Sequence, residues 1–196
     1  PGFASMVGRM SRKGYVLGGG GFISEGTQHH VLALVNLDAE LPKAEVIPLR
    51  FLGHGISFHP TQRFRAAVFE KKGPGACLVD LGERQVVRPI VSPPERRFYG
   101  HGAYSADGLL LYATESLVDQ AFAGVLSVRD AETLRELGTV PTHGCSPHDC
   151  LLIDDGKTLV VSNGGGPLDG GDPPCVCYVE LLTGKLLDKV VLDSPL

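Results

Sequence analysis

The stretch GHGAYSADGLLLYATE, residues 100–115, decides the fold of this chain, because it is one copy of a unit that returns along the sequence. It opens on Gly100-His101-Gly102. The same triplet stands 47 residues earlier as Gly53-His54-Gly55, and His148 follows 47 residues later. A repeat with a period of roughly 40–50 residues is typical of the blades of a β-propeller. The spacing therefore predicts one structural unit for each histidine.

Each histidine opens a similar succession of short apolar runs that are separated by turn residues. After His101 these runs lie at 110–115, 124–130 and 134–140. The separators are rich in Gly, Asp, Thr and Pro, which are typical of hairpin turns. Helical periodicity is weak along the chain, and the one rival segment, 131–137, is too short to predict a helix. Each unit therefore predicts four antiparallel strands.

These units predict an all-β fold, a single β-propeller of about four four-stranded blades. We place an incomplete first blade at 14–50 and further blades at 53–97, 100–142 and 147–193. Another period would open at residue 195, where the chain of 196 residues stops. Because a propeller loses its free sheet edges by closing into a ring, we expect this chain to be part of a larger ring.

Composition and charge exclude several classes of protein. The chain is 43% hydrophobic and 20% charged, as folded soluble proteins are. Its formal charge is −4 and its densest basic stretch, 9–13, is short, so we expect no nucleic-acid partner. Apolar runs such as 31–35 are too short for a membrane span. The chain begins at Pro1, so we expect any signal segment to lie outside it.

The repeat also predicts where side chains gather. In a propeller blade the first strand lines the central channel and forms a hairpin with the second. The start of the first strand and the end of the second therefore lie on the same face of the ring. The starts carry His54, His101 and His148, and the ends carry Glu70, Glu115 and Asn163.

Imidazoles and carboxylates that converge on one axis are the donors of a transition-metal site. We predict that the three histidines bind a metal cofactor such as Cu, Fe or Zn. Glu70, Glu115 and Asn163 are predicted to hold these ligands in position or to add ligands of their own.

Two other interpretations remain open. A Gly-His pair also recurs in WD40 repeats, and a histidine between glycines can fix a turn through its ring nitrogens. The chain would then be a non-catalytic platform that recruits a partner protein. In the third interpretation the chain is a lactonase-like or redox enzyme that uses the same residues. No Ser/His/Asp triad can be assigned, because the sequence does not reveal which residues are adjacent in space.

The five cysteines are too few and too unevenly spaced to predict a disulfide framework. Segment 143–150 holds two histidines and two cysteines, a donor set that suits zinc or copper. Its spacing does not match a paired C-x-x-C module, which favours apolar packing of Cys145 and Cys150. A disulfide between these two is the alternative in an exported protein. Cys175 and Cys177 should face the same side of one strand.

Longer strings of the sequence resemble a bacterial family of unknown function. The matching strings lie at 53–56, 59–60, 98–102, 105–115, 143–144, 147–149 and 155–165. The resemblance covers roughly residues 45–192, although Cys145 and Cys150 stand where small or acidic residues are expected.

The resemblance implies a seven-bladed propeller about twice as long as this chain. It also implies export, usually by a twin-arginine signal, and genes that often lie near those of imelysin-type iron-uptake proteins. With the histidine repeat, it predicts a periplasmic propeller that binds a metal ion or a metal-associated partner protein and is linked to iron uptake.

Overall fold

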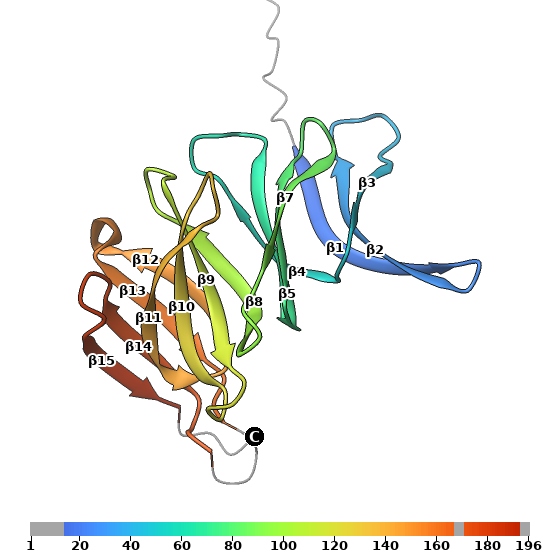
Figure 1. The fold of residues 1–196 in the computed structure, drawn as a ribbon. Coiled ribbons are helices and arrows are strands. Elements are labelled where there is room, and N and C mark those ends of the chain that lie inside the picture. The colour runs from blue at the N-terminus through green and yellow to red at the C-terminus, as the bar shows by residue number, and fades with distance from the viewer. Residues whose placement is uncertain (1–13, 167–170, 193–196) are drawn as a thin grey trace, which may run out of the picture.

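The computed structural model describes residues 14–166 and 171–192, and these residues form antiparallel sheets throughout (Figure 1). They contain fifteen strands and one short 3-10 turn, Asp154–Gly156. The all-β prediction is confirmed. Segment 131–137, the rival for a helix, is a turn that leads into a strand. The basic stretch 9–13 and the end of the predicted fourth blade, Asp193, lie outside the described residues.

The strands follow one another around the molecule in chain order (Figure 1). The first sheet has three strands, in the order β1-β2-β3. The last sheet has four, in the order β12-β13-β14-β15. The bounds are β1 Tyr15–Ser24, β2 Thr27–Asn36 and β3 Ala44–Leu49, then β12 Pro147–Ile153, β13 Thr158–Asn163, β14 Cys175–Glu180 and β15 Leu186–Val191.

The eight strands between them form one continuous sheet, where the sequence predicted two separate units. Each half has the expected hairpin order, but β5 runs past its own hairpin and pairs with β8, at Lys71↔Tyr99 and Gly73↔Phe98. The bounds are β4 Gly53–Phe58, β5 Arg65–Gly73, β6 Gly75–Asp80, β7 Gln85–Val91, β8 Arg96–Tyr104, β9 Leu110–Leu117, β10 Ala123–Asp130 and β11 Glu136–Cys145.

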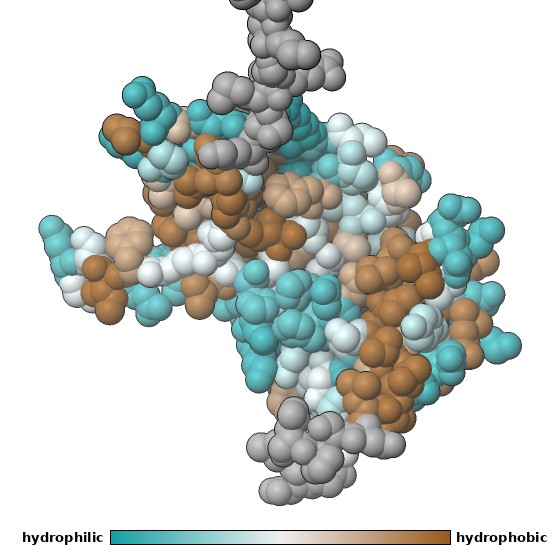
Figure 2. All heavy atoms as spheres, turned by 180° about the vertical axis from the view of Figure 1, so that it is seen from behind, coloured by the Kyte–Doolittle hydropathy of each residue, from teal (hydrophilic) through white to brown (hydrophobic). Residues whose placement is uncertain are grey.

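This arrangement is β-propeller-like. No sheet among residues 14–166 and 171–192 closes on itself, so the ring and its blade count stay predictions. Apolar side chains gather on the side of the last sheet (Figure 2), where Leu187 and Val190 of β15 are about half exposed. Within these described residues, no helix is long and apolar enough to cross a membrane.

The core consists of apolar layers between successive groups of strands. Strand β5 shows how they are built, since residues 66–69 are all fully buried. Successive side chains of a strand point to opposite faces. Val68 accordingly packs with Leu32 and Ile47 of the first sheet, while Phe69 packs with Phe98 and Leu111 on the other side. A strand that is covered on both faces has a continuous apolar run in its sequence, as β5 does at residues 66–69.

The glycines of the repeated triplets allow the first strands of neighbouring units to touch. A Cβ atom on Gly55 would lie 2.0 Å from the carbonyl oxygen of Gly100, and one on Gly19 would lie 1.8 Å from that of Gly53. Gly100 also adopts φ +133°, with the ring of His54 directly beside it. The Gly-His-Gly pattern therefore reflects backbone packing as well as the chemistry of histidine.

We predict that Gly55→Ala destabilises the fold by about 1–3 kcal/mol or more, because backbone cannot yield to the added methyl group as a side chain can. Gly138→Ala in β11 is the matched control, since a Cβ atom added there would meet nothing within 4 Å. It should leave stability unchanged or raise it slightly. Urea unfolding of both variants measures the difference, and equal midpoints would show that the close approach of β4 and β8 is not a constraint.

Candidate functional site

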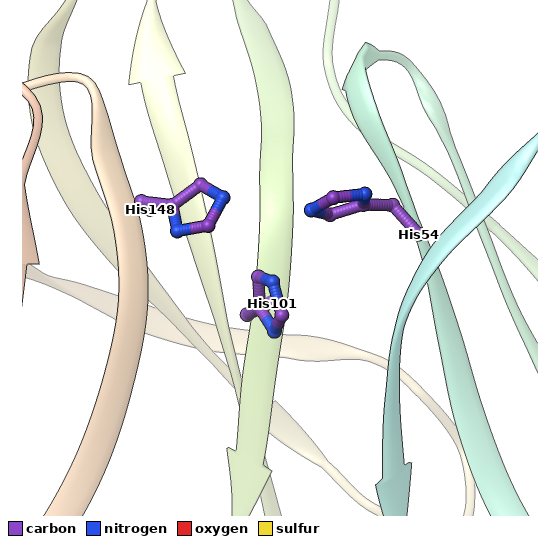
Figure 3. A group of neighbouring side chains, drawn as sticks. All are labelled: His54, His101 and His148. Carbon is purple, nitrogen blue, oxygen red and sulfur yellow. The ribbon is translucent and has the colours of Figure 1, made fainter.

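His54, His101 and His148 come together in space from strands β4, β8 and β12 (Figure 3). The ring centroids lie 5.0 Å apart for His54 and His101, 4.8 Å for His101 and His148, and 5.6 Å for His54 and His148. One ring nitrogen from each lies within 4.8 Å of the other two. We call these three side chains the imidazole cluster.

Each histidine of the cluster lies at a β-bulge, which the sequence did not reveal. The strand pairing shifts between Gly53 and Gly55, between Phe98 and Gly102, and between Pro147 and Asp149. On β4 and β12 the histidine is the one residue left unpaired in its hairpin, and on β8 it is one of three, residues 99–101. A bulge turns a side chain away from the regular alternation, so an irregularity at each strand turns its imidazole toward the other two.

Charged groups flank the cluster on two sides. The ammonium group of Lys71 donates a hydrogen bond to Nε2 of His148 at 3.2 Å. The carboxylate of Asp149 lies 3.8 Å from Nδ1 of His101. One positive and one negative charge thus adjoin the three rings.

The pKa of each imidazole lies below its ordinary value of 6.5. Burial is the main cause for all three, and the positive charge of Lys71 lowers each pKa further. Asp149 opposes these effects at His101 and His148. The rings are therefore neutral at neutral pH, and a neutral imidazole is the form that binds a metal ion.

Two other histidines show what a structural histidine looks like in this fold. His59 is buried, lies 3.0 Å from the carbonyl oxygen of Gly108 through Nε2, and accepts the amide of Gln62 at Nδ1. His143 lies 2.8 Å from the carbonyl oxygen of Gly184. Among the described residues, the ring of His54 makes no hydrogen bond. The turn-fixing function that the repeat also allowed is thus performed by histidines outside the cluster.

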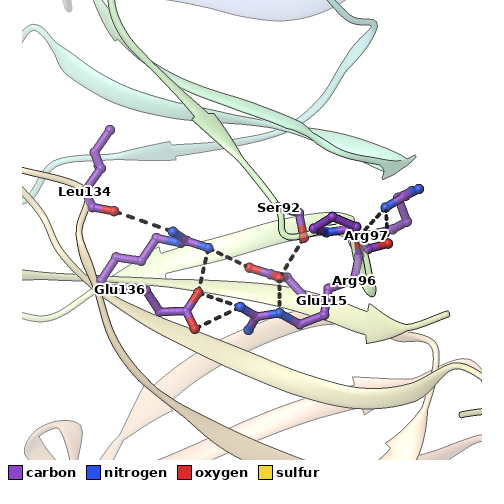
Figure 4. A network of polar contacts seen from close by, with 8 residues as sticks. Ser92, Arg96, Arg97, Glu115, Leu134 and Glu136 are labelled. Atoms are coloured by element: carbon purple, nitrogen blue, oxygen red, sulfur yellow. Dashed lines mark hydrogen bonds and ion pairs between the residues drawn. The ribbon is translucent and has the colours of Figure 1, made fainter. Parts of the chain in front are cut away.

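Glu115 lies in a buried ion network and not in the imidazole cluster (Figure 4). Its carboxylate is fully buried, 3.1 Å from Arg129 and 3.3 Å from Arg96. Glu136 contacts the same two guanidinium groups at 3.0 and 2.7 Å. Each of the four strands β8 to β11 thus contributes one charge, and the network fastens them together.

Glu70 and Asn163 are likewise engaged away from the cluster. The carboxylate of Glu70 accepts the backbone amide of Gly75 at 2.8 Å, which closes the turn between β5 and β6. Thr142 donates its hydroxyl to the side chain of Asn163 at 2.9 Å. In the same way Ser92 donates to Glu115 at 2.9 Å, so both bonds join one unit to the next.

These three residues nevertheless have a shared position. Glu70, Glu115 and Asn163 are the ladder partners of Gly53, Phe98 and Pro147, the residues at which the three bulges begin. Their contacts hold the strands that carry the bulges. We therefore do not assign Glu70, Glu115 and Asn163 as metal ligands.

All five cysteines are free and buried. Burial raises the pKa of Cys77 and of Cys150 to about 12, and it is also the main cause of the raised pKa of Cys145. Without a metal ion these thiols are therefore protonated at neutral pH and behave as small apolar side chains. Cys175 and Cys177 lie on the same side of β14 with sulfurs 3.7 Å apart. The segment 143–150 contributes only His148 to the cluster.

Fold and site together define a β-propeller-like chain with a histidine cluster where its first strands converge. The chain belongs to the family described as "Protein of unknown function (DUF1513)", which matches residues 47–194. No curated protein matches it.

Among solved structures, the chain is similar to hydrazine synthase of Kuenenia stuttgartiensis, with a TM-score of 0.67 and 16% sequence identity. The match covers 85% of this chain and 46% of that one, so this chain spans about half the length of that structure. At this identity the likeness shows the fold alone.

We predict that the three imidazoles titrate below pH 6.5 in the metal-free protein. A lowered pKa in the folded state adds stability above pH 6.5, and this stability is lost as the pH falls through the folded-state values. NMR titration of the ring nitrogens measures this directly. Lys71→Met should raise all three pKa values, whereas Lys72→Met, whose charge is not a cause of the shifts, should leave them unchanged. Equal effects of the two variants would contradict the assignment.

Proposed function

We propose that this protein binds a divalent transition-metal ion through His54, His101 and His148. One observation carries the proposal: three neutral imidazoles, each turned inward by a bulge, converge with one nitrogen apiece inside a 4.8 Å group. Neutral nitrogen donors suit zinc, copper and iron.

The geometry requires a modest inward rotation of the rings. A tetrahedral ion bound about 2.1 Å from each nitrogen needs nitrogens about 3.4 Å apart. His54 is exposed and His101 and His148 are only partly buried, so their rings have room to turn. Three protein ligands leave at least one coordination position open, which is the arrangement of zinc sites that bind a water or a further ligand.

Lys71 competes with the ion, because its ammonium group occupies the lone pair of Nε2 on His148. Its side chain is exposed and can leave this position. Lys71→Met should therefore bind metal more tightly than the natural chain.

We predict one bound metal ion per chain, measured by isothermal titration with Zn²⁺, Cu²⁺ and, without oxygen, Fe²⁺. The general order of affinities for such ligands places Cu²⁺ above Zn²⁺ and Fe²⁺ below both. His101→Ala should weaken binding by more than about 100-fold, since even loss of a group that only supports a ligand costs roughly 10–100-fold. His29→Ala is the matched control, because His29 is an exposed histidine on β2, outside the cluster.

An equal loss in His101→Ala and His29→Ala would sink the proposal. So would unchanged metal binding in His101→Ala. A circular dichroism spectrum of each variant separates loss of the site from loss of the fold. The platform interpretation predicts the opposite pattern, in which His101→Ala lowers stability and no metal binds to either protein.

We also propose a periplasmic location and a link to iron uptake, which the resemblance to exported proteins supports. Fractionation of cells that express the full-length gene product tests the location. Recovery in the osmotic-shock fraction is expected, and recovery with the cytoplasmic enzymes would contradict export. Changed abundance under iron limitation tests the link to iron.

A further inference from the structure

A pocket of about 470 Å³ lies beside the imidazole cluster and is lined by His148 of the cluster and by its neighbour Lys71. It is lined by residues of β5, β8, β9 and β12 and by the turns next to them. Its volume falls in the range of about 300–1,000 Å³ that small-molecule sites occupy. The pocket and the cluster are therefore adjacent and meet at His148.

The pocket is positively charged. Lys71, Lys72 and Arg97 line it, and among the described residues no acidic side chain does. None of these three cations has a carboxylate within ion-pair distance in the described part of the chain. Arg97 donates only to backbone carbonyl oxygens, and the ammonium of Lys72 lies 5.6 Å from the ring centre of Tyr99. Three cations without counter-ions favour an anion.

Strand register gathers these groups on one face of the shared sheet. Lys71 pairs with Tyr99, and Arg97 pairs with Ser116. Arg97 and Tyr99 are two residues apart on β8, and both line the pocket. The extension of β5 onto β8, which joins the two halves of the sheet, thus also builds the pocket wall.

Ser116 supplies an independent indication that the pocket takes a ligand. It is fully buried and lines the pocket, and its hydroxyl has no hydrogen-bond partner in the described structure. A buried hydroxyl without a partner costs free energy that a ligand oxygen would recover. Phe122 and Tyr99 add aromatic surface to the same wall.

The glycines at 164–166 do not bind the anion through their amides. Gly164 donates to the carbonyl oxygen of Ser146, Gly165 to that of Cys145, and Gly166 to that of Asp172. Recognition therefore falls to the three cations and the hydroxyl, with the aromatic rings contacting an apolar part of the ligand.

We propose that this pocket binds a small organic carboxylate with an apolar body, and that Lys71 couples its binding to that of the metal. In the structure the ammonium group of Lys71 contacts Nε2 of His148. An anion in the pocket attracts the ammonium group away from Nε2, which frees the lone pair for a metal ion. By linkage, each ligand raises the affinity of the other by the same factor. Carboxylate binding does not depend on the metal site, whereas the coupling rests on the proposed metal-binding function.

Titration of the metal-free protein with benzoate, followed by NMR, tests the pocket, and inorganic phosphate is the second arm. We expect saturable benzoate binding that shifts the amides of Tyr99 and Ser116. Ser116→Ala should weaken benzoate binding several-fold, and Arg97→Gln should weaken it by at least about 10-fold. Lys185, an exposed cation in the turn between β14 and β15, provides the control, and Lys185→Gln should have no effect. Tighter binding of phosphate than of benzoate would overturn the apolar body, and no saturable binding of either would overturn the pocket.

Zinc titration with and without saturating benzoate tests the coupling. We expect zinc to bind at least about 5-fold more tightly when benzoate is present. Lys71→Met should abolish this difference while it retains zinc binding. Coupling that persists in Lys71→Met would contradict the proposal that Lys71 couples the two binding events. His54→Ala should lose zinc and keep benzoate, since His54 does not line the pocket, and this separates failure of the metal site from failure of the pocket.

Discussion

The close approach of neighbouring first strands is the constraint on which the rest of this structure depends. At Gly55 and Gly100 the backbones of β4 and β8 pass so near each other that no Cβ atom fits between them. This contact sets the distance between the two strands. A wider spacing would separate the rings of His54 and His101, whose centroids are 5.0 Å apart. The Gly-His-Gly triplet therefore determines both the close packing of the two backbones and the distance between the two imidazoles.

The three bulges need support, because a bulge interrupts the hydrogen-bonded ladder of its hairpin. The support differs from unit to unit. Glu70 closes a turn through a backbone amide, Glu115 is held by two buried arginines, and Asn163 accepts the hydroxyl of Thr142. The common requirement is a polar side chain opposite the bulge that can bind a neighbouring strand. This explains why acidic and amide residues recur at these positions without facing the cluster.

The sequence predicted the strands and the meeting of the histidines because both follow from a period, and a period is visible in one dimension. It did not predict that Glu115 is enclosed by Arg96 and Arg129, since these residues lie on different strands and no local pattern links them. Lys71 was missed for a similar reason. Nothing in the repeat distinguishes it from other surface lysines. Only the extension of β5 onto β8 carries it to His148, 77 residues away.

The charge balance of the cluster connects its two proposed ligands. The imidazoles are neutral, Lys71 contributes one positive charge and Asp149 one negative charge, so these five side chains together are nearly balanced in charge. A divalent ion would add two positive charges beside Lys71, next to a pocket that Lys72 and Arg97 also line, and like charges repel. Asp149 lies near Nδ1 of His101 and can orient that ring so that Nε2 faces the ion, as carboxylates do behind metal-bound histidines. One carboxylate does not offset the whole charge, however. A metal ion in this cluster therefore calls for an additional anion, and the pocket that shares His148 is where the fold leaves space for one.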